Sequence, residues 1–211
     1  MKSVRIFAAV GFMVLVVAAL PLSAQERNIK ISVFASQAEM QGETDFGDGF
    51  VTDFDDGNGF GAAASLVMGR FFAVEGAVFN IHTDAGLILD DVAAFDLGKM
   101  NLTPISLGGQ LHVLGQSRFD PYVGAGVAYV PGDDLMSTDL TAAGLGTIEL
   151  ESAVGYYINA GLAFQITEGF GIVVDGRQLQ YEPSSRSSVT GVERDLEITP
   201  RILSAGLRLR F

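Results

Sequence analysis

The chain ends in LSAGLRLRF, residues 203–211. In an extended strand Leu203, Ala205, Leu207, Leu209 and Phe211 share one face, and the intervening serine, glycine and arginines share the other. Alternation with a period of two is typical of a strand whose two faces meet different environments. The apolar face continues to the last aromatic residue, where a soluble protein usually carries polar residues. This stretch therefore predicts a β-protein with one strongly apolar strand face.

The terminal pattern resembles the carboxy-terminal signature of bacterial outer-membrane β-barrels, which the barrel-assembly machinery recognises. The resemblance implies that Phe211, Leu209 and Leu207 form an assembly signal and that this machinery is a partner. The alternative for this strand alone is a soluble β-sandwich that buries its last strand.

The amino-terminal segment predicts export. Lys2 and Arg5 precede an apolar run at 6–20, and small residues follow up to Ala24. A charged region, an apolar region and a small-residue cleavage site are typical of a signal peptide. We expect a signal peptide at 1–24 and one domain at 25–211; a membrane anchor is the alternative, for which the run is short. The chain has no cysteine, so it has neither a lipoprotein anchor nor disulfides.

Eight strand candidates follow, separated alternately by long and short connections. They cover residues 28–38, 60–68, 71–80, 101–114, 120–130, 150–166, 170–181 and the terminal strand. The long connections are 41–58, 81–99, 131–149 and 182–194. Long outer loops and tight periplasmic turns are typical of outer-membrane barrels. The sequence predicts an all-β, eight-stranded, antiparallel up-and-down transmembrane β-barrel.

Composition and charge agree with a barrel. The chain is 48% hydrophobic, yet after residue 24 it has no apolar stretch long enough for a spanning helix. The four long connections hold 16 of the 25 acidic residues and three basic ones. An acidic rim excludes nucleic acid as a partner. It suits an outer surface in contact with outer-membrane lipid and with lipopolysaccharide bridged by divalent cations.

Four segments resemble the outer membrane protein W (OmpW) family or a closely related small outer-membrane β-barrel. They are AVEGAVFNIHTD at 73–84, LTPISL at 102–107, DPYVGAGVAY at 120–129 and the end of the chain at 198–211. Thr103 stands where the family has its first proline, and tryptophan is absent. The resemblance implies an eight-stranded barrel in the outer membrane with a narrow, partly hydrophobic lumen. It also implies a non-enzymatic, passive route for small hydrophobic molecules into or across that membrane.

Nine polar residues fall on the strand faces expected to line the lumen. They are Glu75, Ser106, Gln110, His112, Asn159, Asp175, Arg177, Arg208 and Arg210. A barrel of eight strands is only wide enough for side chains to fill it. Unpaired charges there are costly, so we expect ion pairs across the interior. The hypotheses are a salt-bridged plug that stiffens the barrel and a polar lining that selects solutes.

Catalysis and metal binding find little support. A Ser-His-acid arrangement needs a hydroxyl and a carboxylate within reach of the imidazole, and Ser106 is six residues from His112 on the same strand. We expect no catalytic residue and no cofactor. Asp45, Asp48 and Asp53 begin an acidic stretch suited to a weak cation site, but the EF-hand pattern fails at Gly57 and Ala64. A solvated acidic loop without a metal is therefore the prediction.

The second long connection is unusually apolar for a solvated loop. Leu87, Ile88, Leu89 and Phe95 form a candidate loop mouth that captures hydrophobic solutes, and Leu135, Met136, Leu140 and Leu145 add to it from the third. Alternatively, these loops pack on one another. A structural or adhesive barrel, whose acidic loops contact ions, lipopolysaccharide or host surfaces without transport, is the second hypothesis for function.

Overall fold

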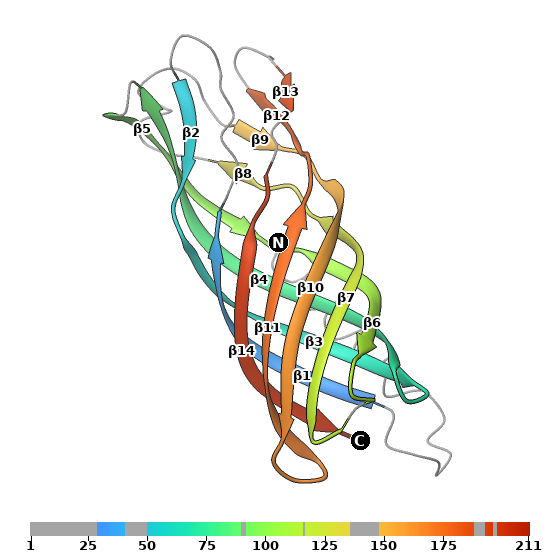
Figure 1. Cartoon of the computed structure of the whole chain (residues 1–211). Coiled ribbons are helices and arrows are strands. Elements are labelled where there is room, and N and C mark those ends of the chain that lie inside the picture. The colour runs from blue at the N-terminus through green and yellow to red at the C-terminus, as the bar shows by residue number, and fades with distance from the viewer. Residues whose placement is uncertain are drawn as a thin grey trace.

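A computed structural model describes residues 29–40, 50–89, 92–115, 117–135, 148–187, 193–195 and 198–211. Eight antiparallel strands close into the barrel that the sequence predicts (Figure 1). They are β1 (Ile29–Glu39), β3 (Gly57–Met68), β4 (Phe72–Leu89), β6 (Ile105–His112), β7 (Phe119–Val130), β10 (Ala153–Gln165), β11 (Phe170–Gln180) and β14 (Arg201–Arg210). The first strand pairs with the last, from Lys30 opposite Arg210 to Glu39 opposite Arg201. Pairing of β4 with β6 completes the ring, so lipid meets no open edge there.

Six further strands extend the barrel at one end, opposite the tight turns and the carboxy-terminus (Figure 1). They are β2 (Phe50–Phe54), β5 (Val92–Leu102), β8 (Asp134–Leu135), β9 (Ile148–Leu150), β12 (Ser184–Ser187) and β13 (Glu193–Asp195). β2 and β5 flank the long β4, whereas β8, β9, β12 and β13 form a separate small sheet. We call this end the extended end and the opposite end the turn end.

The structure corrects predictions about two expected loops and one expected strand. The connection expected as a loop at 81–99 is mostly strand, because β4 continues to Leu89 and β5 returns from Val92. Part of 41–58 is the strand β2. The strand expected at 101–114 is interrupted at Thr103–Pro104, because proline has no amide hydrogen for the ladder. The Pro104 carbonyl still accepts a hydrogen bond from the Phe79 amide, at 3.1 Å.

The two faces of the wall differ as the alternation predicts. The outward face is apolar and exposed; its members include Val33, Leu107, Val127, Ile158, Val174, Leu203, Leu207 and Leu209. Inward residues of the same strands are buried. No helix among the described residues is long and apolar enough to cross a membrane.

The interior has two layers. The layer toward the turn end is polar and includes Lys30, Glu75, Asp120, Asp175 and Arg208, all at most 4% exposed. The layer toward the extended end is apolar and consists of residues such as Phe79, Ile81, Leu102, Leu179, Tyr181, Ile198 and Ile202, again at most 4% exposed. Neither layer leaves its side chains open to water.

Glycines provide the space for two buried tyrosines. A Cβ on Gly161 would lie 2.3 Å from the Tyr122 hydroxyl oxygen, and one on Gly108 would lie 2.5 Å from that of Tyr157. A Cβ on Gly126 would also approach the Tyr157 ring, at 2.8 Å. Small residues on one strand thus admit a large side chain from another strand of the wall, which fills the narrow interior.

Candidate functional site

Arg177 forms the centre of the polar layer. It projects inward from β11, with Nη2 2.8 Å from Glu75 Oε1 and Nη1 2.7 Å from Ser106 Oγ. Its guanidinium lies between two rings, 4.4 Å from the centroid of Tyr157 and 5.0 Å from that of Phe79. Gln110 and Ser65 donate to the second Glu75 oxygen. The Arg177–Glu75 ion pair and its hydrogen bonds therefore join β3, β4, β6 and β11 across the lumen.

Asp175 connects the Arg177–Glu75 ion pair to Tyr122 and Asn159. One carboxylate oxygen accepts hydrogen bonds from Tyr122 Oη and Asn159 Nδ2, both at 2.8 Å. The other lies 3.7 Å from Arg177 Nε. The hydrogen bonds fix the carboxylate beside the guanidinium, so that one cation serves two anions.

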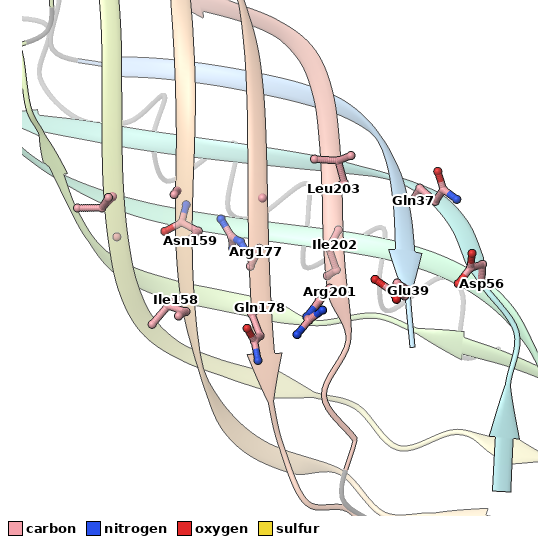
Figure 2. Close-up of a pocket in the computed structure, with 14 residues that line it drawn as sticks. Gln37, Glu39, Asp56, Ile158, Asn159, Arg177, Gln178, Arg201, Ile202 and Leu203 are labelled. Carbon is pink, nitrogen blue, oxygen red and sulfur yellow. The ribbon is translucent and has the colours of Figure 1, made fainter. Parts of the chain in front are cut away.

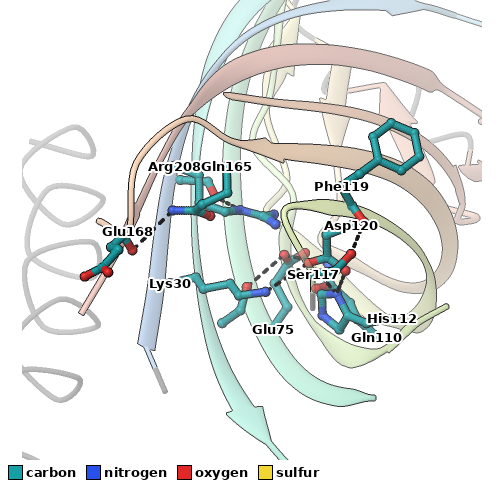
Figure 3. Close-up of polar contacts among 12 residues, drawn as sticks. Lys30, Glu75, Gln110, His112, Ser117, Phe119, Asp120, Gln165, Glu168 and Arg208 are labelled. Atoms are coloured by element: carbon teal, nitrogen blue, oxygen red, sulfur yellow. Dashed lines mark hydrogen bonds and ion pairs between the residues drawn. The ribbon is translucent and has the colours of Figure 1, made fainter. Parts of the chain in front are cut away.

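A second cluster lies nearer the turn end (Figure 3). Lys30 Nζ and His112 Nδ1 converge on Asp120, at 3.2 and 2.9 Å. Arg208 donates through Nε to Ser32 Oγ at 3.0 Å, and its guanidinium carbon lies 5.4 Å from the Tyr122 ring centroid. Tyr122 thus contacts both clusters, through its ring and through its hydroxyl.

The charges of this interior balance. Among the described residues Lys30, Arg177 and Arg208 are buried cations, and Glu75, Asp120 and Asp175 are buried carboxylates. Balanced, hydrogen-bonded charges are the condition under which ionic groups persist in a low-dielectric interior. The arrangement fills this part of the lumen and ties strands far apart in the sequence to one another.

The structure places eight of the nine expected lumen residues in this interior: Glu75, Ser106, Gln110, His112, Asn159, Asp175, Arg177 and Arg208 are buried. Arg210 is half-buried at the turn end. Ser106 bonds to Arg177, and no described hydroxyl bonds to His112, whose Nε2 has no partner. Asp120 and Tyr122 were not among the expected residues. Their alternation with outward Val123 is the signal that would have identified them.

The residues of the candidate mouth are described only in their backbone. Leu87, Ile88 and Leu89 end β4, Phe95 lies in β5, and Leu87 is opposite Phe95 in the register. Outside the described residues lie the expected signal peptide at 1–24 and Asp45, Asp48, Met136, Leu140 and Leu145. No group of three or more histidine, aspartate or glutamate side chains suited to a metal occurs in the described part of the chain.

The wall changes character where β1 ends at Glu39 and β14 begins at Arg201. Beyond this point the described part of β2 pairs only with β4, and that of β13 only with β12. No described ladder therefore joins the two sheets of the extended end on this side of the barrel. We call this the wall break.

A groove of about 780 Å³ runs along the wall beside this break (Figure 2). Its outward-facing lining residues are Val123, Ile158, Ala160, Gly176, Leu203, Gln37, Glu39, Asp56, Gln178 and Arg201. Four inward residues also line it: Asn159, Arg177 and Ile202, which are at most 6% exposed, and the half-buried Gly124. The open space therefore lies on the outer side of the wall, and we call it the wall groove.

A closed barrel with an apolar outer belt, a charge-paired interior and short turns at one end defines a transmembrane β-barrel of the bacterial outer membrane. The model of the OmpW family matches residues 22–211. The chain belongs to the OmpW family, as the sequence motifs predict.

Solved structures and one curated relative are similar to the chain. OprG from Pseudomonas aeruginosa superposes with a TM-score of 0.69 at 16% identity, covering 87% of this chain and 96% of that one. AlkL, solved in DMPC lipid bilayers, gives 0.64 at 18% identity, covering 91% and 95%. Outer membrane protein W of E. coli gives 0.57 at 14% identity, covering 87% and 97%. At such identities these likenesses establish the fold.

The curated relative is an uncharacterized outer-membrane protein, y4mB, of Sinorhizobium fredii. It is 27% identical over 152 residues, which cover 71% of this chain and 59% of that protein. The chain thus spans less than two thirds of the length of this relative. Its family and its relative place the protein in the outer membrane.

Proposed function

We propose that the protein gives small hydrophobic molecules a passive route into the outer membrane. Solute is captured at the extended end and leaves sideways into lipid. The observation that carries this proposal is a closed lumen beneath an apolar extension. Because both interior layers are packed, solute that reaches the barrel from outside has no continuous path along its axis.

Two features support the sideways route. The sequence of the extension is apolar at Leu87, Ile88, Leu89 and Phe95, and these residues belong to the strands β4 and β5 beyond the barrel. The wall break is the candidate exit, since no ladder joins β2 to β13 among the described residues, and a seam without a ladder opens at a smaller cost than a paired one. Hydrophobic solutes gain free energy on leaving water for lipid, so the route needs no energy source.

Replacing Leu87, Ile88, Leu89 and Phe95 with serine tests the capture step. Each apolar side-chain contact contributes roughly 1.5–3 kcal/mol, so we expect uptake of a hydrophobic probe into proteoliposomes to require a concentration at least about tenfold higher. The matched control replaces the exposed Val113 and Leu114 at the turn end with serine and should leave uptake unchanged. Folding of each variant is checked by heat-modifiable migration on a gel.

The second hypothesis is a structural or adhesive barrel. The acidic residues concentrated in the long connections favour it, because they suit contacts with cations, lipopolysaccharide or host surfaces. Unchanged uptake in a folded serine variant, or no uptake by either protein, would favour this hypothesis over a conduit.

A further inference from the structure

We propose that the turn end binds an anionic glycerophospholipid of the inner leaflet through two exposed arginines, Arg70 and Arg118. We call these two residues the arginine pair. Short turns face the periplasm in barrels of this class, so the turn end meets the headgroups of that leaflet. The site lies at the opposite end of the barrel from the extended end, so the proposal does not depend on solute uptake.

Arg118 is held in place by an aromatic ring and by a backbone oxygen. Its guanidinium carbon lies 5.3 Å from the centroid of the exposed Phe164 ring, and its Nε donates to the Gln165 carbonyl oxygen at 3.1 Å. An arginine that stacks on a ring by its flat face keeps the N–H groups at its edge available as donors. Because these contacts already fix the side chain, little conformational entropy remains to be lost when a phosphate binds.

Arg70 has the same arrangement on the neighbouring turn. Its guanidinium carbon lies 5.2 Å from the centroid of the exposed Phe71 ring. A Cβ on Gly115 would lie 2.6 Å from Arg70 Nε, so the arginine packs against the bare backbone of the turn between β6 and β7. That turn has a φ of 64° at Gly115, a conformation that favours glycine. Arg118 follows three residues later, within about 11 Å along the chain, so the arginine pair flanks a single turn.

The charge of this end is complementary to an anionic headgroup. The ion pairs of the described residues all lie in the lumen, and none includes either member of the arginine pair. Glu168 is the exposed side-chain carboxylate that the structure describes at the turn end, against two arginines, and the half-buried Arg210 accompanies the terminal carboxylate. Exposed carboxylates gather instead at the extended end, at Glu39, Asp55, Asp56, Asp84 and Glu151. An anionic lipid is therefore attracted to the turn end and repelled from the other.

The surface beside the arginine pair is apolar, as the acyl part of a phospholipid requires. Val113, Leu114 and Phe119 are exposed there, and Phe119 is opposite Phe164 in the β7–β10 register. Figure 3 shows the Phe119 ring pointing away from the polar cluster of the interior. Aromatic side chains are typical of the level at which headgroups meet hydrocarbon, and long basic side chains there reach toward the phosphates. A guanidinium donates two parallel hydrogen bonds to a phosphate, so the two parts of the site match the two parts of the lipid.

The test measures binding of phosphatidylglycerol to the purified protein in a non-ionic detergent by native mass spectrometry. Arg70→Gln combined with Arg118→Gln should weaken binding by about tenfold or more, because each basic residue near the surface adds to the attraction of anionic lipid. Arg70→Lys combined with Arg118→Lys should restore only part of it, since lysine keeps the charge but lacks the paired donors. Arg201→Gln, which removes an exposed arginine at the extended end, is the matched control and should bind like the unaltered protein. Heat-modifiable migration on a gel verifies that each variant is folded.

Equal binding by the unaltered protein and the folded double glutamine variant would overturn the proposal. So would equal binding of phosphatidylcholine with the same acyl chains, because the site would then not recognise an anionic headgroup. A loss for Arg201→Gln as large as that for the arginine pair would also contradict it, since binding would then follow the total charge of the protein rather than this site.

Discussion

Arg177→Met should lower the free energy of unfolding by about 3–5 kcal/mol, the cost of removing one partner from a buried ion pair. The substitution leaves Glu75 without a cation and Asp175 without its neighbouring charge in an interior from which water is excluded. Urea titration in lipid bilayers, followed by the gel shift between folded and unfolded forms, measures the loss.

The companion variant combines Arg177→Met with Glu75→Gln. Removing both charges should recover part of the loss, because an uncharged pair carries no ionic desolvation penalty. A loss below about 1 kcal/mol for Arg177→Met alone, which is typical of an exposed ion pair, would contradict the buried plug.

Leu107→Arg should cost about 2–4 kcal/mol, the penalty for arginine at mid-depth on the lipid face of a barrel. Leu107 is 56% exposed and lies in the middle of β6. Val113→Arg, at a residue just beyond the turn-end terminus of the same strand, is the depth control and should cost at most about 1 kcal/mol. The same urea titration compares the two, and equal losses would show that Leu107 does not face hydrocarbon.

The barrel strands could be predicted from sequence because their two faces differ so strongly. The alternation from Leu203 to Phe211 indicates which residues face lipid and which face the interior, and burial agrees. The extended end could not be predicted in the same way. Strands that leave the membrane have no lipid face, so the segment around Leu87 lacks the alternation that marks a barrel strand and was expected to be a loop.

The interior shows a second limit. Alternation identified the inward positions but did not indicate which charged side chains form ion pairs. Partners such as Arg177 and Glu75 are 102 residues apart in the sequence. Alternation alone also gives no reason for a glycine at position 108. In the structure a Cβ on Gly108 would lie 2.3 Å from the Ala125 carbonyl oxygen. Pairing and close approach depend on register across strands, which a single sequence does not specify.

The wall groove was not predicted at all. Its polar residues come from three separate strands: Gln37 and Glu39 from β1, Gln178 from β11 and Arg201 from β14. In the sequence, each of these residues indicates only the polar end of a strand. Only closure of the barrel brings them together into one row. Sites built from single residues of many strands are therefore the part of this molecule that requires a structure.

The central claim is that the lumen is closed and that hydrophobic solutes pass sideways. Proteoliposomes loaded with a small polar solute and exposed to a hydrophobic fluorescent probe test both parts in one measurement. The account predicts faster probe uptake than in protein-free liposomes, together with full retention of the polar solute. Release of the polar solute through the protein, or no acceleration of probe uptake, would contradict it.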